Sequence, residues 1–220
     1  MTMTMTPAGQ DHSHDHDHDH DHDHDHSAIE AEDTSNSDTA LLADALRLVL
    51  IEKGIFTAAD VQAQLDLMET RSDRNGARLV ARAWQDPAFK AALLEDGAKA
   101  ALDAGFDMKG TPLVVLENTD AVHNVVVCTL CSCYPVTLLG PSPEWYKSKA
   151  YRGRVVRDPR SVLDEFGTSI GADREVRVHD STADMRYMIL PKRPTGTDDL
   201  SEAALADIVT RNGLIGVAEV

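Results

Sequence analysis

The residues with the clearest chemical potential are the three cysteines of the chain, Cys128, Cys131 and Cys133, which fall within six positions. A chain of 220 residues that gathers all its thiols in this way favours a single thiolate site. Disulfide frameworks need cysteine pairs spread along a small secreted chain. A structural zinc site usually takes two ligands from each of two separated loops, and no second cysteine pair exists here. The spacing therefore predicts a metal site of another kind.

The loop between the last two cysteines adds further donors. Only Ser132 separates Cys131 from Cys133, so a metal held by three sulfurs also lies within reach of the backbone amides of Ser132 and Cys133. Amide nitrogens bind a metal only after losing a proton, which requires a strongly polarising ion, and zinc has no electronic preference for planar nitrogen donors. Three sulfurs and two nitrogens suit a trivalent transition metal and leave one position open for catalysis.

The segment Cys128–Tyr134 resembles the metal-binding claw of the nitrile hydratase alpha subunit, and residues 128–133 are called the claw below. The likeness runs from about Ala40 to the C-terminus and is strongest after Leu116. Besides the claw, it is carried by ten blocks: Leu116–Asp120, Val122–Val127, Trp145–Ser148, Tyr151–Arg152, Arg154–Arg157, Pro159–Arg160, Met188–Pro191, Arg193–Asp198, Val209–Arg211 and Leu214–Val217.

The resemblance implies a ligand set and a pattern of oxidation. Cys128, Cys131 and Cys133 are expected to bind through sulfur, and Ser132 and Cys133 through their amide nitrogens. Cys128 is expected to remain a thiolate, with Cys131 oxidised to a sulfinic acid and Cys133 to a sulfenic acid. Metal-bound thiolates at accessible positions oxidise selectively, which makes this pattern chemically reasonable.

Two claw residues favour one metal over another. Thr129 and Tyr134 are similar to the cobalt branch of the family, whereas the iron branch usually has serine and threonine at these places. The resemblance therefore implies one cobalt(III) per chain, with iron(III) as the less favoured alternative.

The activity implied by the resemblance is the hydration of a small nitrile to an amide. Cys133, Ser132 and Tyr134 are the expected catalytic residues, with the sulfenate oxygen of Cys133 as nucleophile or base. Two alternatives stay open. One is the catalytic subunit of a thiocyanate hydrolase, which has the same kind of metal site. The other is a non-catalytic cobalt carrier.

The chain departs from the family pattern at two places. After Tyr134 the family commonly reads Pro-Trp-Pro, whereas this chain has Val136 and Thr137 after its proline, so a large aromatic residue is missing beside the claw. Upstream, His123 is followed by Asn124, where some members have two histidines. We expect a structural or supporting role for His123, and a surface position for His179.

The charge of the claw implies a partner. Three thiolates and two deprotonated amides around a trivalent ion leave a net charge of about −2, and a buried anion needs cationic hydrogen-bond donors. The resemblance implies that arginines of a beta subunit supply them. It also implies an activator protein that helps to insert cobalt.

Composition favours an intracellular enzyme subunit and excludes some other classes. The N-terminus has no basic region followed by an apolar stretch, and no apolar run is long enough to span a membrane. Thiols confined to one loop fit a cytoplasmic location. The formal net charge is −16, but residues 1–39 contribute eleven acidic residues and no Lys or Arg. The remainder has an ordinary acidic surface without the basic stripe of a nucleic-acid-binding protein.

The N-terminal segment, residues 1–37, is predicted to be a disordered tail rich in His and Asp. Eight of the ten histidines lie between His12 and His26 and alternate with aspartate after His14. Such a segment has too little apolar surface to fold. Neutral imidazoles bind cobalt, nickel and zinc, so the tail either captures metal ions or serves as a solvated extension.

The next segment, residues 38–110, is predicted to be a helical arm. Its apolar pattern indicates a helix from Ala40 to Lys53, and Thr57 can begin a second helix with Asp60 at its third position. Asn75–Gly76 is expected to interrupt or bend that stretch. Asp86–Pro87 is expected to begin a helix that runs through Glu95 and on toward Ala104.

Residues 111–220 are predicted to form a mixed α/β metal-claw domain, so the whole chain belongs to the α+β class. The expected strands are 113–116, 122–127, 175–178 and 187–190, of which the second leads directly into the claw. Short helices are expected after Ser142–Pro143 and Asp158–Pro159, with a terminal helix capped by Ser201. Arg152, Arg154, Arg157 and Arg160 are expected to form a solvated helix face.

Overall fold

The computed structural model describes residues 27–29 and 37–220 of the chain. The predicted His/Asp tail lies outside the described residues, apart from Ser27–Ile29 and the first residue of the first helix. Five helices precede four short strands, and further short helices separate and follow the strands. The α+β class is confirmed.

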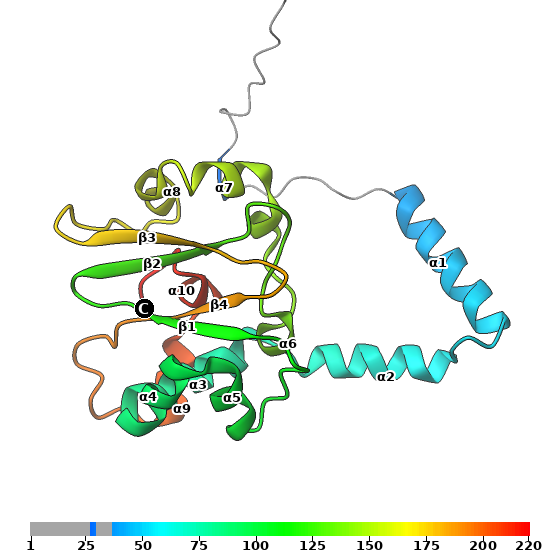
Figure 1. Cartoon of the computed structure of the whole chain (residues 1–220), viewed down its shortest axis with the longest axis horizontal. Helices are drawn as coiled ribbons and strands as arrows, with labels where there is room; N and C mark the ends of the chain where they lie inside the picture. Colours follow the sequence, from blue (N-terminus) through cyan, green and yellow to red (C-terminus); the bar gives the residue numbers. More distant parts are fainter. Residues whose placement is uncertain (1–26, 30–36) are drawn as a thin grey trace, which may run out of the picture.

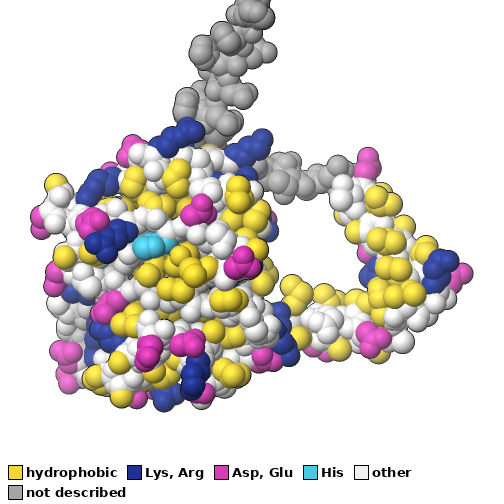
Figure 2. All heavy atoms as spheres, in the orientation of Figure 1, with side chains coloured by type: hydrophobic (Ala, Val, Ile, Leu, Met, Phe, Trp, Pro, Cys, Tyr) yellow, Lys and Arg dark blue, Asp and Glu magenta, His cyan; other side chains and the backbone are white. Residues whose placement is uncertain are grey.

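The first two helices form an arm that stands away from the rest of the molecule (Figure 1). They are α1 (Ser37–Glu52) and α2 (Ala58–Glu69), and none of the described side chains on either is buried. Gly54, at φ 68°, follows the end of α1, and Thr57 and Asp60 form the predicted capping box at the start of α2. Since apolar residues remain exposed along both helices (Figure 2), the arm has an apolar surface that the described part of this chain does not cover.

The expected break at Asn75–Gly76 was wrong, because the helix boundary lies earlier, at residues 70–72. Both residues belong to the first turns of α3 (Asp73–Gln85). A Cβ atom on Gly76 would lie 2.4 Å from Cδ2 of Leu139 and 2.8 Å from Cδ1 of Leu214. The glycine is therefore required by close packing of α3 against later parts of the chain, and not by a turn.

The helix predicted to begin at Asp86–Pro87 is present and runs through Glu95 as expected, but it does not continue toward Ala104. The Asp86 side chain accepts hydrogen bonds from the first amides of α4 (Pro87–Glu95). Asp96 then ends α4 and caps α5 (Gly97–Asp103), accepting a hydrogen bond of 2.9 Å from the Lys99 amide. A second aspartate cap thus divides the segment into two helices.

The four strands form two parallel pairs. β1 (Leu113–Glu117) pairs with β4 (Arg186–Leu190), and β2 (Val122–Val127) pairs with β3 (Glu175–Asp180). Figure 1 shows them in one layer in the order β3, β2, β4, β1. The predicted strands are confirmed, with ends that differ by one or two residues.

Helices surround this layer at both edges (Figure 1). α7 (Lys149–Arg154) and α8 (Pro159–Glu165) lie beside β3, whereas α3, α4, α5 and α9 (Glu202–Ile208) lie beyond β1. Two further short elements, α6 (Val136–Leu139) and the 3-10 helix η1 (Glu144–Lys147), connect the claw to α7. Asp158 and Ser201 cap α8 and α9 as predicted.

One helix was not expected from the sequence. α10 (Arg211–Ile215) is capped by Thr210 and packs against β4 and α3. Gly216 ends it at φ 89°, where a Cβ atom would lie 2.0 Å from the Asn124 carbonyl oxygen. The five-residue helix is too short to give a clear apolar period, which explains why the pattern missed it.

The domain boundary placed at residue 110 remains a prediction. Of the five helices before it, α3, α4 and α5 contribute fully buried side chains to the same core as the strands, including Leu79 and Leu93. Only α1 and α2 stand apart. Within the described part of the chain, no helix is long and apolar enough to cross a membrane.

The expected solvated arginine face was wrong for three of its four members, since only Arg157 is exposed and Arg152 contacts the Thr129 carbonyl oxygen. Arg154 makes a half-buried ion pair with Glu165. The guanidinium of Arg160 donates to the carbonyl oxygens of Ile170 at 2.6 Å and Arg174 at 2.5 Å. These arginines fasten α7 and α8 to neighbouring segments, an arrangement that depends on residues distant in the sequence.

Candidate metal centre

The claw begins where β2 ends. Cys128 follows Val127 directly and is 1% exposed, Cys131 is exposed and Cys133 lies between these extremes. The sulfur of Cys131 is 3.5 Å from that of Cys128 and 3.4 Å from that of Cys133. Among the described residues, this is the one group of three or more His, Cys, Asp or Glu side chains whose ligand atoms lie close enough together to hold a metal.

A carboxylate on the neighbouring strand fixes the first half of the claw. Asp180 ends β3 opposite Val127 in the parallel register. Its two oxygens accept hydrogen bonds from the Thr129 amide at 2.9 Å and the Thr129 hydroxyl at 2.5 Å. Asp180 was not predicted as part of the site, because only the strand register brings it there.

Two tyrosines and an arginine hold the remaining backbone of the site. The Tyr151 hydroxyl donates to the Val126 carbonyl at 2.7 Å, just before the claw, and the Tyr146 hydroxyl donates to the Cys133 carbonyl at 2.9 Å. A guanidinium nitrogen of Arg152 is 3.4 Å from the Thr129 carbonyl oxygen. None of these roles was predicted from the sequence, although all three residues lie in blocks that carried the resemblance.

The cysteines differ in how readily they lose a proton. Hydrogen bonds from the Cys133 and Cys128 thiols, and from the backbone amides of Ser132 and Cys133, lower the pKa of Cys131 to about 7. Burial, together with hydrogen bonds to the sulfurs of Cys131 and Cys128, raises the pKa of Cys133 to about 12. The exposed Cys131 thiol therefore loses its proton more readily than the Cys133 thiol.

A pocket of about 400 Å³ opens beside the sulfurs of Cys131 and Cys133. Its wall contains the apolar side chains of Met68, Val136 and Pro141. It also contains two cations, Lys147 and Arg186. One guanidinium nitrogen of Arg186 is buried and has no hydrogen-bond partner among the described residues. The site thus has space for a small organic molecule next to a group of sulfurs and positive charge.

Comparison of the sequence with known protein families agrees with the presence of a metal site in this loop. Residues 37–218 match the family described as nitrile hydratase, alpha chain. The chain belongs to the nitrile hydratase alpha-chain family. Members are subunits of hydro-lyase enzymes, so the resemblance read from the claw and its flanking blocks is confirmed.

Three relatives show the range of nitrile hydratase alpha chains and similar proteins. A low-molecular-weight cobalt-containing nitrile hydratase alpha subunit from Rhodococcus rhodochrous is 48% identical over 186 residues, covering 84% of this chain and 90% of the relative. Thiocyanate hydrolase subunit gamma from Thiobacillus thioparus is 48% identical over 194 residues, covering 83% of this chain and 80% of the relative. A double mutant of the Fe-type nitrile hydratase from Comamonas testosteroni Ni1 has a TM-score of 0.79 at 46% identity, covering 84% of this chain and 92% of that one.

The claw residues of this chain fit a bound metal. Three sulfurs lie within 4.8 Å of one another, and the amides of Ser132 and Cys133 are directed at the sulfur of Cys131. Thiolates are soft ligands that select transition metals over magnesium or calcium. The expected donor atoms therefore lie close together.

Tyr134 lies deeper than expected for a substrate ligand. The side chain is buried, its ring meets that of Tyr146 edge-on at 5.4 Å, and its hydroxyl has no hydrogen-bond partner among the described residues. Burial raises the pKa of this phenol well above its ordinary value, so the hydroxyl stays protonated. Its catalytic role remains a prediction.

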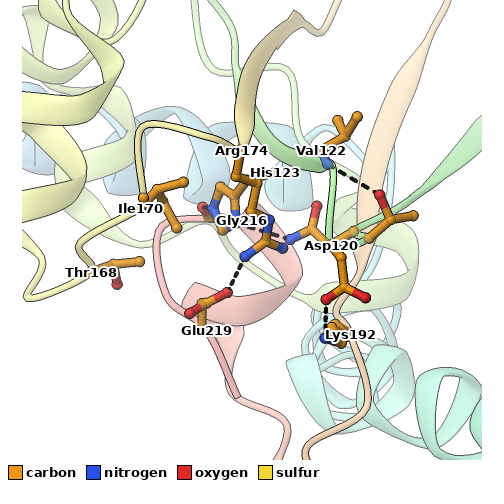
Figure 3. A network of polar contacts seen from close by, with 12 residues as sticks. Asp120, Val122, His123, Thr168, Ile170, Arg174, Lys192, Gly216 and Glu219 are labelled. Atoms are coloured by element: carbon orange, nitrogen blue, oxygen red, sulfur yellow. Dashed lines mark hydrogen bonds and ion pairs between the residues drawn. The ribbon is translucent and has the colours of Figure 1, made fainter.

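His123 is a structural residue and not a ligand (Figure 3). The buried imidazole has Nε2 at 2.7 Å from the Gly216 carbonyl oxygen and Nδ1 at 3.4 Å from the Asn118 side-chain nitrogen. Figure 3 shows the ring beside Arg174, which pairs with Glu219 near the C-terminus. His179 is only partly exposed, since its Nε2 lies 2.8 Å from Oδ1 of Asn124.

The buried imidazole of His123 is expected to make stability depend on pH. Burial lowers the pKa of His123 below its ordinary value of 6.5, so near this pH the unfolded chain binds a proton that the folded chain excludes. The free energy of unfolding should therefore fall as pH drops through about 6.5. His123→Gln should flatten this slope in urea unfolding followed between about pH 7.5 and 5.5.

His179→Gln serves as the matched control for that experiment. Burial also lowers the pKa of His179, but the ring is only half-buried, so its removal should flatten the slope less. A His123→Gln protein with the full wild-type slope would contradict the assignment.

Proposed function

We propose that this chain is the catalytic subunit of a nitrile hydratase, which adds water to a small nitrile to give the amide. The supporting observation is the group of three sulfurs that opens into a pocket with an apolar wall. A nitrile has a polarisable nitrogen and an apolar substituent, which such a site can accommodate together. The cysteine thiols of the site fit a reducing cytoplasm.

Cobalt is the proposed metal, one ion per chain. Cys128, Cys131 and Cys133 would hold it through sulfur, and Ser132 and Cys133 through their amide nitrogens. When bound, a trivalent ion supplies Lewis acidity that polarises the nitrile. Relatives of both metal types exist, since the Rhodococcus rhodochrous relative is cobalt-containing and the Comamonas testosteroni relative is Fe-type. The proposal of cobalt therefore rests on Thr129 and Tyr134, which are similar to the cobalt branch.

The chain's own side chains then have distinct tasks. Cys133, oxidised by dioxygen to a sulfenate, would act in one of two ways. Its oxygen would accept a proton from the water that attacks the nitrile carbon, or it would attack that carbon itself and then be replaced on sulfur by an oxygen from water, so that the net change is the addition of one water. Lys147 and Arg186 are positioned to balance the negative charge of the claw and of the developing imidate. Tyr134 would act as a neutral donor from the pocket wall, because its phenol stays protonated.

A beta subunit is proposed to cover the claw and the arm. Leu130, at the tip of the claw, is 87% exposed, and exposed leucines continue along α1 and α2. Large apolar patches of this kind mark interaction surfaces. The partner would also bring arginines to the anionic claw, and an activator protein would assist cobalt insertion.

The oxidation state of the claw gives a direct test. Active enzyme should have two added oxygens on Cys131 and one on Cys133, whereas Cys128 should remain unmodified. The reason is accessibility, since Cys131 is exposed and Cys128 is 1% exposed. Mass spectrometry of the claw peptide, isolated without reductant, measures the additions. A fully active preparation with three unmodified thiols would contradict the prediction.

Thiocyanate hydrolysis is the second candidate, because the Thiobacillus thioparus relative is as similar to this chain as the cobalt-containing nitrile hydratase. Both substrates end in a carbon–nitrogen triple bond, so the claw does not distinguish them. The apolar side chains of Met68, Val136 and Pro141 suit an uncharged nitrile, whereas Lys147 and Arg186 in the same wall would also accommodate the thiocyanate anion. Turnover of acrylonitrile and thiocyanate by the same purified complex decides between the two functions.

A further inference from the structure

A second cavity lies at the end of the strand layer opposite to the claw. Its volume is about 400 Å³, the same as that of the pocket beside the claw. The carboxyl ends of one parallel strand pair meet there, since Glu117 is the last residue of β1 and Pro191 directly follows β4. Ligands of α/β proteins commonly bind beyond the carboxyl ends of parallel strands. This cavity is called the β1/β4 pocket below.

The length of β2 separates the two cavities. A turn leads from Glu117 to the start of β2 and is closed by a hydrogen bond of 2.9 Å from the Thr119 amide to the Val122 carbonyl. Six strand residues then lead to the claw, a distance of roughly 20 Å. Among the described residues, the linings of the two cavities have no member in common. The β1/β4 pocket is therefore a separate site.

One wall of the β1/β4 pocket is apolar and aromatic. It consists of Ala83 and Trp84 from α3, Pro87 from the start of α4 and Pro191. The indole N–H of Trp84 donates to the Pro191 carbonyl at 2.9 Å, which fixes the ring in place. Because that donor is already used, the indole offers the cavity only an apolar surface. This wall suits the ring or branched carbon chain of a small ligand.

Charged side chains line the rest of the cavity, and cations outnumber anions among them. Lys90 and Glu117 form a half-buried ion pair, so their charges offset each other. Lys192 pairs with Asp120 (Figure 3), whose side chain is 88% exposed. Such an exposed ion pair contributes little to stability, so a ligand anion can take the place of Asp120 beside the lysine.

Arg193 is the fixed cation of the β1/β4 pocket. Its guanidinium donates to the Trp84 carbonyl at 3.1 Å, and to the hydroxyl and carbonyl oxygens of Thr197 at 3.1 Å and 2.7 Å. The carboxylate of Asp198 is 3.9 Å away, beyond hydrogen-bond distance. A guanidinium has five N–H groups, so two of them have no hydrogen-bond partner within the described part of the chain. A planar guanidinium with free N–H groups matches the two oxygens of a carboxylate.

We propose that the β1/β4 pocket binds a small carboxylic acid in its ionised form. The carboxylate would lie at Arg193 and Lys192, and an apolar substituent would lie against Trp84 and Pro191. A phosphate group fits less well, because the apolar wall has no donors for its additional oxygens. The smaller cavity beside this one, of about 190 Å³, has Glu219 in its wall, which disfavours an anion there. The inference goes beyond the proposed function and does not depend on it, since no atom of the claw takes part.

Binding of 4-fluorobenzoate to the complex of the full chain with its partner tests the proposal. A titration followed by fluorine NMR gives the dissociation constant. 4-Fluorobenzyl alcohol has the same ring without the charge, and it is neither a nitrile nor an amide. Because the alcohol cannot form charge-assisted hydrogen bonds with Arg193 and Lys192, it should bind on the order of tenfold more weakly than the acid.

Variants of the pocket locate the bound acid. Lys192→Gln should weaken 4-fluorobenzoate binding about two- to fivefold, because it removes one cation from an exposed position. Lys99→Gln is the matched control, since Lys99 is an exposed, ion-paired lysine on α5 outside the pocket, and it should bind as wild type.

A second variant adds charge without removing a contact. Pro87→Glu places a carboxylate at the rim of the pocket and should weaken binding by a similar factor through repulsion. Glutamate is favourable in the first turn of a helix, so this variant should fold. Size-exclusion chromatography checks that each variant complex is intact.

The outcomes separate this site from the claw. Equal affinity for 4-fluorobenzoate in wild type, Lys192→Gln and Pro87→Glu would overturn the proposal, because the acid would then bind elsewhere. No measurable binding, equal affinity for acid and alcohol, or an equal loss in Lys99→Gln would also overturn it. A complex that binds the acid as expected but hydrates no nitrile would overturn the proposed function alone.

Discussion

Replacing Cys128 by serine is expected to remove both the claw cobalt and the nitrile-hydrating activity. The wild-type chain, freed of residues 1–26 so that tail histidines do not contribute, should contain about one cobalt. Cys128 is the buried sulfur directly after β2, so its loss leaves only the sulfurs of Cys131 and Cys133 to hold the ion. Loss of Lewis-acid catalysis worth several kcal/mol should lower turnover on the order of a thousandfold or more.

Ser132→Ala is the matched control for this experiment. Ser132 lies between two cysteine ligands, but the Ser132→Ala variant keeps all three sulfurs and both backbone amides. The variant should therefore retain cobalt. Elemental analysis and acrylonitrile turnover are measured on the same complexes. Iron or zinc in place of cobalt in the wild-type protein would refute the metal assignment, and a Cys128→Ser protein with one firmly held cobalt would refute the ligand set.

The arm is expected to be necessary for assembly with the partner and thereby for activity. Leu42 and Leu46 lie one turn apart on α1 and are 69% and 56% exposed. Burying such a side chain contributes about 1.5–3 kcal/mol, so replacing both by aspartate should weaken the complex on the order of a hundredfold or more. Size-exclusion chromatography of the co-expressed subunits measures the association, and nitrile turnover should fall with it.

Leu102→Asp provides the control, since Leu102 on α5 is 57% exposed but lies outside the arm. It should leave both assembly and turnover close to wild type.

The chain expressed alone should turn over nitriles orders of magnitude more slowly than the complex, because removing the cationic partner of a buried anion costs about 3–5 kcal/mol. An isolated chain with the turnover of the complex would contradict the role of the partner.

Local signals in the sequence were sufficient for the group of three cysteines and for most helix starts. The claw is contained in six consecutive residues, and caps such as Asp86 and Thr57 act within three residues of their own position. Features that depend on distant contacts could not be predicted in this way. Gly76 is read as a turn signal until Leu139 and Leu214 are known to pack against it.

The supporting residues of the site show the same limit. Asp180 reaches Thr129 only because β3 pairs with β2 in a parallel register, and nothing near Asp180 in the sequence indicates that pairing. Tyr146 and Tyr151 act on the claw through main-chain carbonyls, whose positions a sequence pattern does not contain. The clustering of the three sulfurs was therefore predictable from the sequence, whereas the residues that hold their loop in place were not.

The bond between Thr129 and Asp180 has a consequence for the order of events during synthesis. The two residues are 51 positions apart, so all three thiols leave the ribosome before the carboxylate that fixes their loop has been made. Parallel strands with long connections also pair late in folding. We expect the three thiols of the nascent chain to lack a fixed arrangement until β3 pairs with β2. During this interval the thiols are most accessible to oxidation and to binding of the wrong metal ion.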